Sequence, residues 1–272
     1  MTHGPTNIDS KDKCIYCYDS NVELTDEHIV PFSLGGVHII QKASCLKCNK
    51  ITTKFERKVA RDLWGDARIS YDAPSRRKKN RKDFISMGNS EIPASEYPAG
   101  LVFYEMNIPG ILQGLAEDVD ISKLWKMVVI HDDKRMETFL KENANKPTLS
   151  FRNVPQEFGQ LLAKIGYGQV LTRLDLDDFN PICLPYITGE KSNVSYVVGG
   201  VLTDAQPIKE TGYILNTKGI IISDNRLLLI AEVRLYSNTH APGYQIIVGE
   251  ILGSENITRV IKKMNSTEKV IN

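Results

Sequence analysis

Four of the five cysteines stand in two CxxC pairs, Cys14–Cys17 and Cys45–Cys48, and this pattern restricts the fold most strongly. Each pair puts two thiolates on one tight turn, and four thiolates form a closed tetrahedral zinc shell without a position for water. So short a segment cannot build a sufficient core, so the metal supplies folding energy. The spacing therefore predicts one structural Zn²⁺, against the alternative of free thiols on unrelated turns. Cys183, in the apolar run ICLPYI, is expected to be a buried small hydrophobe.

The chain of 272 residues with 42% hydrophobic content is long enough for one large domain or two ordinary ones. No apolar run approaches the length that spans a bilayer, and the N-terminus lacks the apolar core of a signal peptide. We therefore expect a cytoplasmic protein without a membrane partner. Residues 1–85 hold 16 Lys and Arg against 11 Asp and Glu, whereas residues 86–272 hold 18 against 22. A basic N-terminal part suits a polyanion partner.

Apolar residues at every fourth position, Phe55, Val59 and Leu63, predict a helix over about 49–64. The basic run 73–82 follows, and a Gly- and Pro-bearing stretch then predicts a boundary at 85–95. We expect an N-terminal unit over 1–85 and a larger α+β domain over 95–272. Within the latter, helices are predicted at 132–145 and 154–171, and β-branched and aromatic runs predict strands at 101–108, 125–131, 147–151, 196–202, 213–223, 226–236 and 244–252.

The segment LTDEHIVPFSLGG (24–36) lies between the cysteine pairs and joins an acid–histidine dipeptide to Ile-Val-Pro and a Gly-Gly turn. The second CxxC is followed at once by Asn49 and the predicted helix. Over about residues 13–60 the chain resembles the HNH endonuclease, or ββα-metal, family. The resemblance implies a ββα module, which the zinc holds together, and phosphodiester hydrolysis with one divalent ion. With the larger domain, the chain is expected to have an α+β fold that begins with this module.

Position by position, the resemblance makes His28 the general base and Glu27 and Asn49 ligands of a catalytic Mg²⁺ or Mn²⁺. A neutral imidazole can take a proton from water near pH 7, and hard cations prefer carboxylate and amide oxygens. Asp26 is an alternative to Glu27, and Asn49 is also a plausible helix N-cap. The family's middle Asn is missing, with Gln41 and Ser44 as substitutes, and His38 is a weak candidate for any role.

Basic residues follow the motif on the predicted helix and in the run after it. In a nuclease they would bind phosphates without reading sequence, and otherwise they are a solvated helix face and a linker. The candidates are Lys54, Arg57, Lys58, Arg61, Arg76, Arg77, Lys78, Lys79, Arg81 and Lys82. The expected partner is nucleic acid, with DNA as the first choice.

Residues 95–272 contain no motif that we can tie to chemistry, and His131 and His240 have no partners in sequence. We expect this domain to sense a ligand, oligomerise, bind a regulatory partner or restrain the nuclease. Two alternatives stay open for the whole chain: a zinc-ribbon nucleic-acid-binding module without catalysis, and a zinc-stabilised adaptor. Only a nuclease has a reason to keep Glu27, His28 and Asn49 together.

Overall fold

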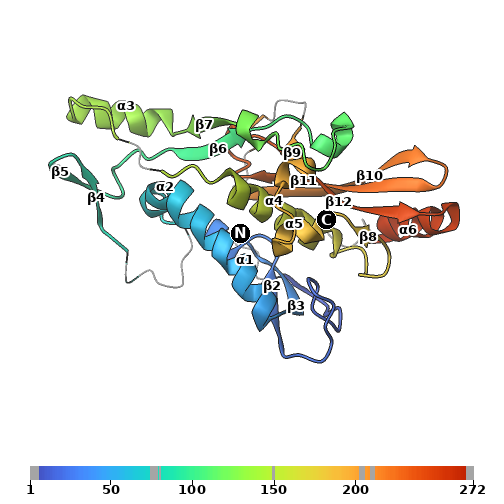
Figure 1. Ribbon diagram of the computed structural model, residues 1–272. Coiled ribbons are helices and arrows are strands. Elements are labelled where there is room, and N and C mark those ends of the chain that lie inside the picture. Colours follow the sequence, from blue (N-terminus) through green and yellow to red (C-terminus); the bar gives the residue numbers. More distant parts are fainter. Residues whose placement is uncertain are drawn as a thin grey trace.

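The N-terminal module of the computed structural model is a small sheet followed by one helix (Figure 1). The structure describes residues 6–73, 79, 81–148, 151–201, 206–208 and 212–267. Strand β3 (His38–Cys45) is the centre of the sheet, with β1 (Thr6–Ile8) parallel to it and β2 (Leu24–His28) antiparallel. A 3₁₀ turn (Phe32–Leu34) connects β2 to β3. The ββα arrangement implied by the resemblance is thus present.

Helix α1 (Leu46–Lys58) begins directly where β3 ends, three residues before the predicted start. The Cys45 sulfur caps the helix by accepting a hydrogen bond from the amide of Cys48. This cap replaces the one suggested for Asn49, which lies inside the first turn instead. The predicted helix does not stay α-helical to its end, because a π-helical segment (Val59–Leu63) separates α1 from α2 (Gly65–Ser70).

Two hairpins follow the module. The first pairs β4 (Phe84–Met87) with β5 (Ser90–Pro93), and the second pairs β6 (Leu101–Glu105) with β7 (Lys126–Ile130). Two 3₁₀ turns (Gly110–Gln113 and Ser122–Leu124) lie between β6 and β7, and α3 (Asp133–Glu142) follows. The second hairpin and α3 confirm the elements expected at 101–108, 125–131 and 132–145. The strand expected at 147–151 does not form at 147, 148 or 151, and residues 149–150 lie outside the described part.

The larger domain is built on an antiparallel sheet in the order β10-β11-β12-β8, and β9 also pairs with β12. The long strands are β10 (Tyr213–Ser223), β11 (Arg226–Leu235) and β12 (Tyr244–Leu252), as predicted. The short ones are β8 (Asn180–Pro181) and β9 (Val198–Gly200), around α5 (Leu184–Thr188) and a 3₁₀ turn (Val194–Tyr196). Helix α6 (Ser254–Thr267), which the sequence analysis missed, packs on this sheet.

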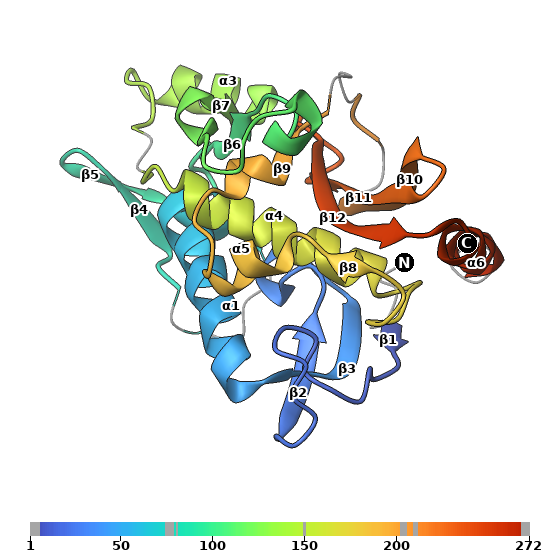
Figure 2. The ribbon, with the colours of Figure 1, turned by 45° about the vertical axis from the view of Figure 1, so that its right-hand side comes forward.

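Helix α4 (Pro155–Val170) lies between the N-terminal module and the large sheet, and contacts α1 on one side and β11 and β12 on the other (Figure 2). Its residues from Phe158 to Val170 are nearly all buried. Trp64, at the end of the π-helical segment, packs its ring against Phe103, Phe158 and Tyr236. The described residues of the module and of the larger domain therefore share one hydrophobic core. In the described part of the chain, no helix has the length and apolar character that crossing a bilayer requires.

Candidate functional site

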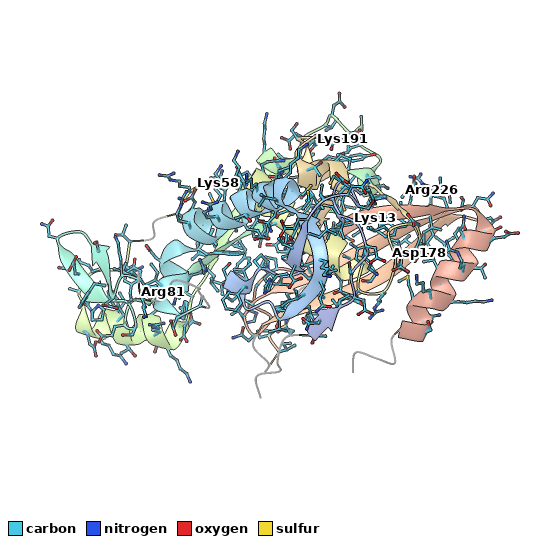
Figure 3. The ribbon with its side chains drawn as sticks, turned by 90° about the horizontal axis from the view of Figure 1, so that it is seen from below. Lys13, Lys58, Arg81, Asp178, Lys191 and Arg226 are labelled. Atoms are coloured by element: carbon cyan, nitrogen blue, oxygen red, sulfur yellow. The ribbon has the colours of Figure 1, made fainter. Side chains whose placement is uncertain are left out.

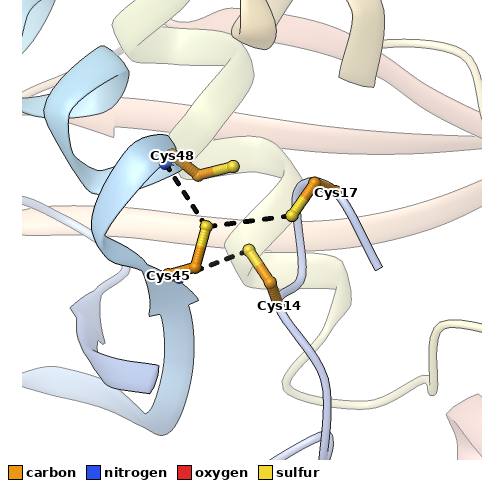
Figure 4. A group of neighbouring side chains, drawn as sticks. All are labelled: Cys14, Cys17, Cys45 and Cys48. Carbon is orange, nitrogen blue, oxygen red and sulfur yellow. Dashed lines mark hydrogen bonds between the residues drawn. The ribbon is translucent and has the colours of Figure 1, made fainter. Parts of the chain in front are cut away.

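The two CxxC pairs meet at the junction of β3 and α1, where their four sulfurs lie within 4.8 Å of one another (Figure 4). The Cys17 and Cys45 sulfurs are 3.8 Å apart, and the amide of Cys45 donates to the Cys14 sulfur over 3.4 Å. Cys14, Cys45 and Cys48 are buried and Cys17 is exposed. Burial opposes ionisation of Cys45, but the amide of Cys48 and the neighbouring thiols outweigh it and lower the pKa of Cys45. The arrangement is that of a zinc site, as predicted.

Cys183 is fully buried and lies outside this cluster, at the start of α5. Burial raises the pKa of its thiol, which keeps it protonated and unreactive. Its assignment as a small hydrophobic residue is thus confirmed.

Strand β2 carries the acid–histidine pair beside an irregularity in its pairing with β3. The register jumps between Thr25, opposite Ser44, and Glu27, opposite Ile40. The Asp26 carboxylate accepts a hydrogen bond of 3.0 Å from the amide of Lys42, a residue with a positive φ of 45°. Asp26 therefore holds the bulge together. After the bulge, Glu27 pairs with Ile40 and His28 pairs with Ile39 at the end of the strand.

The Glu27 side chain points into the protein interior and is 7% exposed. Its Oε1 atom lies 2.7 Å from the ammonium of Lys164, which comes from α4. The same ammonium lies 2.9 Å from Oε1 of Glu56 on α1. Burial raises the pKa of Glu27; the ammonium of Lys164 opposes this shift and the charge of Glu56 adds to it. For Lys164, burial favours the neutral amine, but the charges of Glu27 and Glu56 outweigh it and raise its pKa.

His28 ends β2, and its side chain is half-buried next to Phe32, with the two ring centroids 6.1 Å apart. Its main-chain carbonyl accepts a hydrogen bond from Lys164. The chain then turns through Pro31 to Gly36, where a side chain could not fit: a Cβ on Gly36 would lie 1.7 Å from the carbonyl oxygen of Val30. Both ends of the histidine segment are thus fixed, one by a lysine and the other by a glycine.

Asn49 lies in the first turn of α1, partly exposed, and its side-chain oxygen accepts a hydrogen bond from Thr53. Of the substitutes for the missing middle Asn, Gln41 is exposed on β3, and Ser44 is buried and donates to the Cys45 carbonyl. His38 packs against Tyr213, and burial lowers its pKa. In the described residues, the cysteines are the one group of three or more His, Cys, Asp or Glu side chains that converges tightly enough to hold a metal.

The basic residues expected to bind phosphate divide into two groups. Lys54 and Arg57 on α1 are exposed, as are Lys79 and Lys82. Lys58 pairs with Glu157, Arg61 with Asp62 and Arg81 with Asp72. Lys58 and Arg81 belong to separate regions of the surface (Figure 3). Arg76, Arg77 and Lys78 lie outside the described residues.

A hollow of about 380 Å³ lies between α1, α4 and α5, and Lys50, Lys54 and Lys58 line its α1 side. The opposite side carries Gln160, Thr188 and the acidic Glu157, which pairs with Lys58. Lys50, Lys54 and Lys58 are thus one helical turn apart beside the hollow, and Lys58 is already paired with a carboxylate. Lys50 was not among the predicted residues, although its spacing to Lys54 and Lys58 was visible in the sequence.

Sequence reasoning also missed Lys164 and Glu56. A signal for Lys164 was available, because it is the one charged residue in the apolar stretch LLAKIGYG of a helix predicted to be buried. Lysine is almost never fully buried unless it is paired. Its partners could not be identified, since they lie more than 100 residues away in the sequence.

Residues 14–63 match the family model described as HNH endonuclease. No curated protein and no solved structure matches the chain.

Proposed function

Residues 14–63 form an HNH endonuclease module, and from this premise we propose that the chain hydrolyses phosphodiester bonds of DNA by a one-metal mechanism. The observation that carries the proposal is the position of His28. It ends a strand that is joined through β3 to the cysteine cluster and to α1, within the matched segment. In the proposal, this strand end is the place at which the imidazole meets the scissile phosphate.

His28 acts in the proposal as the general base. Its neutral imidazole takes a proton from the attacking water, a role for which the ordinary histidine pKa near 6.5 is suited. The fixed bulge before it and the tight turn after it hold the strand end, so that the ring is positioned in advance. General-base assistance of this kind typically accelerates a reaction by about 10²–10⁴-fold.

Glu27 and Asn49 are the proposed ligands of a catalytic Mg²⁺ or Mn²⁺. A carboxylate and an amide are the donors such ions prefer. When bound, the ion supplies charge stabilisation at the scissile phosphate and at the leaving oxygen. The donor chemistry fits, but in this structure the Glu27 carboxylate is already paired with Lys164. A divalent ion that binds Glu27 must therefore compete with the ammonium of Lys164.

DNA binding is proposed to depend on the lysine-lined hollow together with Arg57 and the basic residues at 76–82. Contacts to phosphates give affinity that falls steeply with salt and carries no sequence information. Exposed Lys54 and Arg57 are better placed for this than Lys58, whose ammonium already pairs with Glu157.

A zinc-ribbon nucleic-acid-binding module without catalysis is the second candidate function. One observation favours it: the carboxylate expected to bind the catalytic ion is buried and neutralised by a lysine. Such a module would keep the zinc cluster and the basic surface, and it would have no use for His28.

Incubation of the full chain with supercoiled plasmid in Mg²⁺ or Mn²⁺ tests the two candidates, with His28→Ala as the variant. We expect wild type to nick or linearise the plasmid, and we expect the variant to lose at least about 100-fold in rate. The zinc content of both proteins should be equal, which shows that the module is intact. Salt-sensitive binding by both proteins without strand breaks would support the binding module instead. Equal cutting by both would remove His28 from the mechanism.

A further inference from the structure

Lys164 is a buried cation held between the N-terminal module and the larger domain. Its side chain is 1% exposed, and its ammonium donates hydrogen bonds to the carbonyls of His28 and, over 3.3 Å, Ile29. It also forms ion pairs with Glu27 and Glu56. One amino group thus contacts both the backbone of the proposed general base and the side chain of the proposed metal ligand.

The two carboxylates meet at one point from different elements, Glu27 from β2 and Glu56 from α1. The ammonium lies at that point, 2.7 and 2.9 Å from their nearest oxygens. The Glu56 side chain is 21% exposed, and the Lys164 ammonium is the one partner that the described residues give its Oε1 atom. Two carboxylates with one monovalent cation retain a net negative charge, which a divalent ion would neutralise.

The ammonium and a divalent ion compete for the carboxylate of Glu27, because two cations held at the same carboxylate repel each other. Lys164 belongs to α4, which packs on β11 and β12 of the larger domain through its neighbours. Gly166, two residues further along α4, lies against Ala231 and Ile246 of these strands. A movement of the ammonium that shifts α4 would therefore also change the packing between the larger domain and the nuclease module.

We propose that Lys164 is an internal competitor for the catalytic divalent ion, and that Glu56 joins Glu27 in binding that ion when the ammonium withdraws. The proposal rests on the proposed function for the identity of the ion, and it extends that function by a second carboxylate ligand and a restraint on metal entry. Because coupling free energies are reciprocal, metal binding weakens the ion pairs of Lys164 with Glu27 and Glu56 by as much as these ion pairs weaken metal binding.

The direct test is Lys164→Met, which keeps the unbranched side chain and removes the charge. The variant leaves the buried carboxylate of Glu27 and the partly buried one of Glu56 without their cation, which is strongly destabilising. An ion that binds the folded state alone restores stability. We therefore expect millimolar Mn²⁺ to raise the Tm of Lys164→Met by about 5 °C or more. The rise in wild type should be clearly smaller at the same concentration.

The matched control is the triple variant Lys164→Met, Glu27→Gln, Glu56→Gln, in which the pocket is uncharged. It should show no more Mn²⁺ response than wild type. A response of the triple variant equal to that of Lys164→Met would place the ion elsewhere and overturn the proposal. So would equal Tm shifts in wild type and Lys164→Met.

Should Lys164→Met not fold in buffer alone, the measurement becomes refolding from urea with and without Mn²⁺. Refolding only in Mn²⁺ supports the proposal, and failure in both conditions overturns it. His28→Ala separates this inference from the nuclease proposal. Introduced into the Lys164→Met background, it should leave the Mn²⁺ shift unchanged even if neither protein cuts DNA.

Discussion

Gly36 is the residue at which the turn after the histidine is most restricted. Its hydrogens face the carbonyl of Val30, and a methyl group there would overlap the backbone. Neighbouring Gly35 has a φ of +84°, but its Cβ position is open. The two glycines are therefore needed for different reasons, one for space and the other for conformation.

We expect Gly36→Ala to lower the free energy of unfolding by at least about 2 kcal/mol, because the backbone must move to admit the methyl group. Gly35→Ala should cost about 1–2 kcal/mol, the penalty of a left-handed conformation. Urea denaturation of both variants and wild type measures the difference. Equal losses for the two variants would contradict the distinction.

At the residue scale, the sequence was sufficient to predict the motif, but not the residues that contact it in the fold. The cysteine spacing was sufficient for the metal cluster, because all four ligands lie within 35 residues of one another. The orientation of Glu27 was not predictable, since it is set by Lys164, 137 positions later in the chain. The role of Asp26 at the β2–β3 bulge depends in the same way on the backbone of Lys42.

The cysteine cluster determines how β3 and α1 are joined. Cys45 ends the strand, caps the helix with its sulfur and belongs to the metal cluster. Because one residue has all three roles, a zinc ion bound to the cluster would also fix the direction of the helix relative to the strand.

We expect Cys48→Ser to lose bound zinc and to lose helix content through α1, because the module has little other support for this junction. Metal analysis and far-UV circular dichroism measure the two losses. Cys183→Ala is the matched control, a cysteine buried outside the cluster. Its zinc content should equal that of wild type, and zinc retained by Cys48→Ser would count against a four-cysteine site.

Elements with strong periodicity were predicted well, and the rest depended on tertiary contacts. Strands β10 and β12 match their predicted ranges residue for residue, because they are β-branched runs ended by turn residues. Helix α6 was missed, although Ile257 and Val260 bury one face of it against the sheet. The strand expected at 147–151 had composition in its favour, but among its described residues, 147, 148 and 151, none is in a strand.

At the scale of the whole molecule, the domain boundary at 85–95 stays a prediction. The hydrophobic core contains residues from both sides of this boundary. Trp64 of the module packs on Phe103 and Phe158 of the larger domain. Removing residues 95–272 would expose this tryptophan and leave Glu27 without Lys164. A truncated module is therefore a poor test of whether the larger domain restrains the nuclease, and substitution at Lys164 is the better one.

Charged contacts also connect the two ends of the chain. The Asp175 carboxylate pairs with Lys11, at 2.7 Å, and with Lys263 of α6, at 2.6 Å. Hydrogen bonds from these two lysines lower the pKa of Asp175 to about 2. A carboxyl group whose pKa is depressed by folding stabilises the protein above its unfolded pKa, near 3.9, and loses this contribution as the pH falls toward 2.

We expect Asp175→Asn to cost less than about 1 kcal/mol at pH 6, because the side chain is largely exposed and the pairs are screened. The difference from wild type should shrink as the pH is lowered from 4 toward 2. Urea midpoints at pH 6 and below pH 3 measure it. If the stability difference between wild type and Asp175→Asn stayed constant across this pH range, the stabilisation would not come from the charge of Asp175.

The π-helical segment Val59–Leu63 has a consequence for comparing this chain with others. A turn closed by i→i+5 hydrogen bonds holds one residue more than an α-helical turn. Chains with the same module but a regular helix here are expected to be one residue shorter between Phe55 and Trp64. An alignment without that gap would place the residue before or after Trp64 opposite the residue that fills the same position in the other chain, and the aromatic contact of Trp64 with the core would go unrecognised.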